Sequence, residues 1–109
     1  MKARRERFAR NESIFREVNE RIEEVGASEA APDERVEFLC ECGNEDCTET
    51  IAMTLREYER VRSDAAQFVV VPGHEALDLE HPVEESERFR IVRKHPEEAA
   101  IAQDSDPRA

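Results

Sequence analysis

The three cysteines of this 109-residue chain, Cys40, Cys42 and Cys47, lie close together in the segment C-E-C-G-N-E-D-C. Thiolates are preferred ligands of structural zinc, which holds four donors in a tetrahedron with each sulfur about 2.3 Å from the ion. Two cysteines on a straight strand cannot bring their sulfurs so close, so we expect the backbone to bend. Gly43 would permit the bend and leave amides free to point at sulfur. The spacing therefore predicts a metal knuckle, although its near pair is C-x-C and not the C-x-x-C of most zinc ribbons.

A closed zinc site needs a fourth ligand, and the chain has three histidines. His74 follows the run V-V-V-P-G, whose Pro-Gly turn would return the chain toward the cysteines, so His74 is the favoured ligand. His81 and His95 each precede a proline, which keeps them extended and indicates ordinary loop or strand-end residues. An acidic ligand remains an alternative, and its candidates are Glu41, Glu45, Asp46 and Glu49.

Other chemistry of the cysteines fits the sequence less well. They could be reduced thiols that pack as small apolar side chains. An iron–sulfur centre usually takes four cysteines, so a [2Fe–2S] cluster would need histidine as a substitute. A catalytic zinc would need an open position, and the H-E-x-x-H and H-x-E…C-x-x-C patterns are absent. The neighbouring carboxylates also disfavour a nucleophilic thiolate, so we predict no catalytic residue and a structural zinc ion.

The composition predicts a small core. Charged residues make up 39% of the chain and aromatic residues 6%, with no Trp and a formal net charge of −11. A structural metal would supply part of the stability that such a core lacks. No phosphate-cradling glycine loop is present and the chain has only 3 glycines, so we expect neither an enzyme nor a small-molecule substrate.

An apolar stripe formed by Phe8, Phe15, Val18, Ile22 and Val25 predicts an amphipathic helix over residues 8–25. The stripe could pack on the chain's own sheet, on a protein partner or on a second copy. Gly26 is the expected end of the helix, and residues 26–34 are expected to form a linker.

After the linker, residues 35–95 are expected to form a small metal-binding α+β domain with an antiparallel sheet, because 36–40 and 88–94 alternate in polarity and 67–71 is apolar throughout. Strands are expected over 36–40, 49–53, 67–71, 77–83 and 88–94, with 67–71 at the centre of the sheet. Thr54 and Glu57 have the spacing of a capping box, which predicts a short helix over 55–63. The predicted fold class is α+β, with the metal knuckle beside the sheet, and residues 96–109 are expected to form an acidic flexible tail.

The first residues are predicted to form a basic flexible arm over residues 1–9, next to an acidic body. Lys2, Arg4, Arg5, Arg7 and Arg10 would let this arm contact nucleic acid, although the acidic body opposes that use. No signal peptide and no apolar run long enough for a membrane is found, so we expect a cytoplasmic protein without a membrane partner.

Two stretches of the chain carry a resemblance to known sequences. They are Asn11-Glu12-x-x-Phe15-Arg16-Glu17-Val18-Asn19-Glu20-Arg21-Ile22 and Phe38-x-Cys40-x-Cys42…Cys47…Glu57-Tyr58-x-x-Val61-Arg62…Phe68-Val69-Val70-Val71-Pro72-Gly73-His74-Glu75. Over about residues 11–92 the chain resembles a group of short uncharacterised zinc-ribbon-like proteins from high-GC Gram-positive bacteria. The resemblance implies a folded family and implies no activity.

These observations favour a non-enzymatic zinc-binding module that acts in protein–protein interaction or regulation. The first alternative is a thiol redox or metal sensor that uses the same cysteines reversibly. The second alternative is a transcription- or nucleic-acid-associated zinc-ribbon factor.

Overall fold

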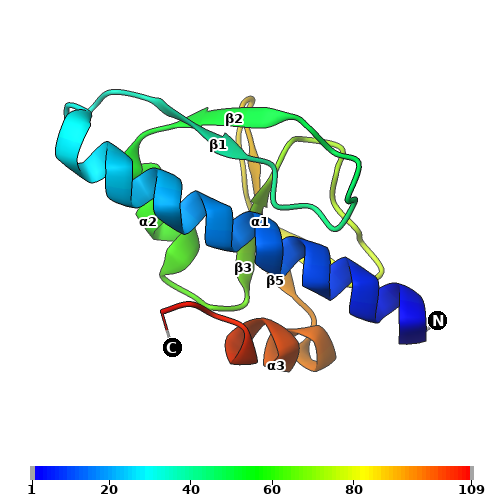
Figure 1. Ribbon diagram of the computed structural model, residues 1–109. Helices are drawn as coiled ribbons and strands as arrows, with labels where there is room; N and C mark the ends of the chain where they lie inside the picture. The colour runs from blue at the N-terminus through cyan, green and yellow to red at the C-terminus, as the bar shows by residue number, and fades with distance from the viewer. Residues whose placement is uncertain (1, 109) are drawn as a thin grey trace.

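One long helix lies across two small antiparallel sheets and two short helices in the computed structural model, which describes residues 2–108 (Figure 1). The predicted α+β class is confirmed. The elements in chain order are α1 (Lys2–Glu29), β1 (Val36–Leu39), β2 (Thr50–Met53), α2 (Leu55–Arg62), β3 (Gln67–Val70), β4 (Glu80–Glu85), β5 (Arg90–Lys94) and α3 (Pro96–Asp104).

The strands form two sheets instead of the single predicted one. β1 pairs with β2, and the other sheet has the order β3-β5-β4. The prediction that residues 67–71 lie at the centre of the sheet is therefore wrong, because β5 takes that place. The free edge of β3 is covered by the cysteine loop, where the Glu41 amide donates to the Val69 carbonyl over 2.7 Å. This cover explains why β3 has the apolar composition of a central strand.

Helix α1 is longer at both ends than the predicted 8–25. Residues 2–9, predicted as a flexible arm, are helical, and so are residues 26–29 of the predicted linker, while Met1 lies outside the described residues. Gly26 does not end the helix. A Cβ atom at Gly26 would lie 3.1 Å from a methyl carbon of Leu55, so this glycine allows α1 to approach α2 closely.

The buried face of α1 differs from the predicted one. Val18 and Val25 of the apolar stripe are 39% and 58% exposed, whereas Glu12, Arg16 and Asn19 are the side chains that α1 buries most deeply. Most of their polar groups have partners inside the fold, although the buried Nε of Arg16 has none within residues 2–108. The Lys94 ammonium lies between Glu12 and Glu80, at 3.0 and 2.8 Å, and Arg16 donates to the carbonyls of Ala65 and Ala102.

The core between α1, α2 and the two sheets is built around aromatic side chains. The rings of Phe38 and Tyr58 stack with their centroids 4.4 Å apart. Helix α2 begins at the predicted capping box, in which Thr54 accepts from the Glu57 amide and Glu57 accepts from the Thr54 amide. The helix therefore begins directly after Thr54, as the capping box predicted, and its Tyr58 side chain is buried in the core.

The C-terminal segment predicted as a flexible tail begins with helix α3. Beyond α3, Asp106 pairs with Arg62 of α2, and Arg108 reaches Glu20 of α1 at 2.8 Å. These contacts hold residues up to Arg108 against the helices, while Ala109 lies outside the described residues. Among residues 2–108, no helix combines the length and the apolar character that crossing a membrane requires.

Candidate metal centre

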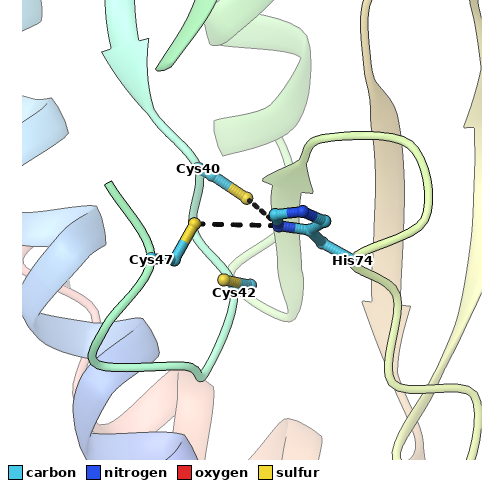
Figure 2. A group of neighbouring side chains, drawn as sticks. All are labelled: Cys40, Cys42, Cys47 and His74. Atoms are coloured by element: carbon cyan, nitrogen blue, oxygen red, sulfur yellow. Dashed lines mark hydrogen bonds between the residues drawn. The ribbon is translucent and has the colours of Figure 1, made fainter. Parts of the chain in front are cut away.

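Cys40, Cys42, Cys47 and His74 meet at one point between the two sheets (Figure 2). Their ligand atoms all lie within 4.8 Å of one another. The Nδ1 atom of His74 is 3.5 Å from the sulfur of Cys40 and 3.7 Å from that of Cys47. The four residues predicted from the sequence as ligands thus form a cluster that could hold a metal ion.

The spacing of the cluster can be compared with that of a real site. Zinc binds sulfur at about 2.3 Å and imidazole nitrogen at about 2.0–2.1 Å, so a tetrahedral site separates sulfur from nitrogen by about 3.5–3.6 Å. The two sulfur–nitrogen distances in the structure, 3.5 and 3.7 Å, are close to that separation. Three thiolates and one imidazole are also a donor set that zinc takes in structural sites.

The backbone places each sulfur through a short turn. Cys40 follows β1 directly, and its amide donates to the Glu49 carbonyl, which extends the β1–β2 ladder toward the cluster. The amide of Cys47 donates to the carbonyl of Asn44 over 3.0 Å, which closes the turn between the second and third cysteines. The loop therefore brings Cys47 back beside Cys40.

His74 arrives from the other sheet through the predicted Pro-Gly turn. Its amide donates to the Val71 carbonyl over 2.9 Å, and Gly73 has φ of 96°, which is the left-handed conformation that favours glycine. The turn reverses the chain at the end of β3. The ring of His74 then faces the sulfurs, as Figure 2 shows.

Backbone amides point at the sulfurs of the cluster. The Val71 amide donates to Cys40 over 3.2 Å, and the backbone of Asn44 and of Glu49 acts to lower the pKa of Cys42 and of Cys47. Hydrogen bonds to the charged form of a group lower its pKa, so these amides favour thiolates. They support metal binding because thiolate, and not thiol, is the ligand.

The three sulfurs have different affinities for protons. A hydrogen bond from Cys40 lowers the pKa of Cys42 to about 5, and the same bond, together with burial, raises the pKa of Cys40. Burial raises the pKa of Cys47, against the opposing amide of Glu49. A metal ion would displace the remaining protons, so its binding must weaken as the pH falls.

Glu49 orients the imidazole and is not placed as a ligand. Its carboxylate lies 2.8 Å from Nε2 of His74, the ring nitrogen that faces away from the sulfurs. A carboxylate in this position keeps the proton on Nε2 and leaves Nδ1 free to bind a cation. The sequence included Glu49 among the alternative acidic ligands, so its position corrects that alternative.

Glu41, between the first two cysteines, points in the opposite direction from them and is fully buried. Its carboxylate accepts from the Tyr58 hydroxyl at 2.6 Å, the Asn19 amide group at 2.9 Å and the Val69 backbone amide at 3.0 Å. Burial raises its pKa, although the three donors oppose that shift. Glu41 therefore ties the cysteine loop to α2, α1 and β3 and is no metal ligand.

Sequence reasoning missed this role, although a signal for it exists. In an extended C-x-C segment the middle side chain points away from the two cysteines, so a carboxylate there must find partners in the protein interior.

Gly43 is required for a reason other than the predicted bend. Gly73 is the only residue among 2–108 with positive φ, so the backbone of Gly43 does not need glycine. However, a Cβ atom at Gly43 would lie 2.2 Å from ring carbons of Phe8, and the Gly43 carbonyl accepts from the Asn11 side chain over 2.9 Å. Helix α1 therefore packs its first turns directly on the cysteine loop.

The remaining candidate ligands lie elsewhere. His81 and His95 stack on each other, with centroids 5.7 Å apart, beside the β4–β5 pair and outside the cluster. Glu45 and Asp46 are exposed and are not among the clustered residues.

The comparisons with known proteins give no relative. No family model, curated protein or solved structure matches the chain.

Proposed function

We propose that this protein is a non-enzymatic, cytoplasmic zinc-binding module whose ion is structural and whose folded surface acts through contacts with other proteins. The observation that carries the proposal is the spacing of Cys40, Cys42, Cys47 and His74, with sulfur–nitrogen distances that match tetrahedral zinc. Four protein ligands complete the coordination, whereas catalytic zinc keeps one position for water or substrate.

The position of the cluster supports a structural role. Three ligands belong to the segment between β1 and β2, and His74 belongs to the segment between β3 and β4. An ion held by all four would cross-link the two-stranded sheet to the three-stranded sheet. Because the core is small for a chain with 39% charged residues, such a cross-link would contribute a large part of the stability.

The test is the metal content and the thermal stability of purified protein. We expect one zinc ion per chain, and we expect a strong chelator to lower Tm and exogenous zinc to restore it. Cys42→Ser should lose zinc and destabilise the domain by several kcal/mol. Thr48→Ala, an exposed change on the same loop, is the control and should retain both properties. Protein with far less than one zinc, whose melting the chelator leaves unchanged, would refute the proposal.

A thiol redox or metal sensor is the second candidate, and one observation favours it. Cys47 is partly exposed, whereas Cys40 and Cys42 are buried. An accessible sulfur could be oxidised first and release the ion. Rapid reaction of the zinc-loaded protein with a maleimide, followed by loss of zinc, would support the sensor. Slow reaction would support the purely structural role.

A further inference from the structure

Helix α1 leaves three large apolar side chains exposed along its flank, next to a groove that it forms with β1. Ile14, Val18 and Val25 are 49%, 39% and 58% exposed, although they are large apolar side chains on one helix. The groove, of roughly 610 Å³, continues the stripe that they form and is lined by Val18, Ile22 and Val25 of α1 and by Val36 of β1. Figure 1 shows that this long helix lies at the surface of the molecule and is not covered along its length.

The residues of this stripe are arranged symmetrically about Val18. Offsets of four, seven and eleven residues return to the same face of an α-helix, because each turn takes 3.6 residues. The pairs at these offsets before and after Val18 are Ile14 and Ile22, Asn11 and Val25, and Arg7 and Glu29. The stripe is therefore basic at one end and acidic at the other, with Ile14, Val18, Ile22 and Val25 between them. Of the inner positions, Ile22 is shared between the core and the groove, and Asn11 donates to the Gly43 carbonyl.

A stripe with this symmetry is complementary to itself in the antiparallel direction. When two such helices cross with Val18 on the twofold axis, each Arg7 faces Glu29 of the other copy, and Ile14 faces Ile22. A parallel pair would instead place arginine against arginine and glutamate against glutamate, which is repulsive. Arg7 and Glu29 are exposed, and neither forms an ion pair within residues 2–108.

We propose that two copies of this chain associate through α1, antiparallel, with the twofold axis at Val18. The inference rests on the proposed function and names its protein partner as a second copy. The stripe from Arg7 to Glu29 is about 33 Å long at 1.5 Å per residue. One helix face from each copy makes a small interface, so the dimer dissociates in the micromolar range.

The first test is sedimentation of the full zinc-loaded chain from about 5 to about 500 µM, a range chosen for a micromolar dissociation constant. The wild-type protein should pass from monomer to dimer. Val18→Glu should remain monomeric, because it places two carboxylates together on the axis. A wild-type protein that stays monomeric at the highest concentration would overturn the proposal. The stripe would then have to be covered by a different protein or stay uncovered.

The direction of pairing is tested by cross-linking under mild oxidation. Val18→Cys places a thiol on the twofold axis and should form a disulfide dimer, whereas Val25→Cys meets Asn11 of the second copy and should not. Cross-linking of both variants would indicate a parallel pair and would contradict the proposal. The wild-type protein, whose native cysteines are in the metal cluster, measures the background.

Charge reversal gives an independent test. Arg7→Glu should weaken the dimer about 3- to 10-fold, and adding Glu29→Arg should restore it. Arg56→Glu makes the same charge change at an exposed site on α2 and should have no effect. If the double variant stays as weak as the single one, the Arg7–Glu29 contact is wrong.

Zinc content and circular dichroism are measured on every variant. A monomeric variant with one zinc and full helicity tests the interface alone. Wild-type protein that dimerises but carries no zinc would instead refute the proposed metal and retain the interface, so the two failures are distinguishable.

Discussion

At the scale of single residues, the candidate ligands depend on neighbours that do not themselves bind the ion. Glu49 holds Nε2 of His74 at 2.8 Å, so that Nδ1 faces the sulfurs of Cys40 and Cys47. Glu41 holds the loop from the opposite side with three accepted hydrogen bonds. Both contacts orient the candidate ligands, which would reduce the cost of binding an ion.

Glu49→Gln tests the orienting contact. The amide cannot hold the imidazole as a carboxylate does, so zinc affinity should fall about 10- to 100-fold while the protein stays folded. Competition with a chromogenic chelator measures the affinity. Glu45→Gln, an exposed change on the same loop, should keep the wild-type affinity. Equal affinities for the two variants would show that the Glu49 contact is not used.

The contact of Gly43 with Phe8 is a second feature that belongs to single residues. Gly43→Ala places a methyl group 2.2 Å from ring carbons of Phe8, so it should destabilise the protein by about 1–3 kcal/mol. The same change made in a Phe8→Ala protein should cost much less, because the ring is gone. Urea unfolding of the four proteins in this cycle measures the coupling. Additive costs would contradict the contact.

At the scale of elements, α1 is unusual because it buries polar side chains more deeply than the apolar Phe8 and Ile22 on the same side. Glu12, Arg16 and Asn19 are buried and hydrogen-bonded to β5, α3 and the cysteine loop. The other face carries exposed Ile14, Val18 and Val25. A buried charged group is tolerated only with partners, so these contacts fix the rotation of α1 about its own axis.

The pH dependence of stability tests the buried contacts of α1. Burial raises the pKa of Glu12 from 4.5 to about 8, although the ammonium of Lys94 opposes the shift and Glu80 and Glu41 add to it. Between these values the folded protein binds a proton that the unfolded chain releases. This contribution to stability is complete below pH 4.5 and is lost as the pH rises through about 8.

Glu12→Gln removes the titrating group and keeps an acceptor for Lys94. Relative to this variant, the wild-type free energy of unfolding should fall between pH 5 and pH 8 by at most about 1.4 kcal/mol per pH unit. Chemical denaturation at several pH values measures both proteins. Glu17→Gln, on the exposed face of α1, is the control and should follow the wild type. If the free energies of unfolding of the wild type and of Glu12→Gln change with pH in the same way, the proposed titration of buried Glu12 is contradicted.

Local patterns in the sequence were sufficient to predict most of the helices and strands. Alternation and apolar runs predicted the strands, the Thr54–Glu57 pair predicted the start of α2, and Pro72-Gly73 predicted the turn that delivers His74. The crowded cysteines predicted the cluster for a chemical reason, since their type and spacing suit a metal. These features depend on residues close in sequence.

The features that escaped prediction depend on residues far apart in the chain. Lys94 makes the burial of Glu12 possible, Leu55 requires glycine at position 26, and Phe8 requires it at position 43. Hydrophobic periodicity found only part of the core-facing side of α1: Phe8, Phe15 and Ile22 are partly buried, but Val18 and Val25 are exposed. It cannot recognise buried polar residues whose partners lie in distant elements. The role of Glu41 escaped for the same reason.

At the scale of the whole molecule, the candidate metal centre and α1 connect parts that would otherwise be weakly joined. The cluster links the two sheets, and α1 contacts the cysteine loop through Asn11 and Gly43. Arg108 returns the C-terminal segment to Glu20 and Glu23 of α1. A structural ion at this junction would stabilise the small core as a unit.

The most direct measurement of the central claim is zinc K-edge X-ray absorption of the purified protein, combined with its metal content. The account predicts one zinc per chain, surrounded by three sulfur atoms at about 2.3 Å and one nitrogen at about 2.0 Å. A His74→Ala protein should lose the nitrogen contribution and keep the sulfur shell. Protein without stoichiometric zinc, or with a shell of fewer than three sulfurs, would contradict the account.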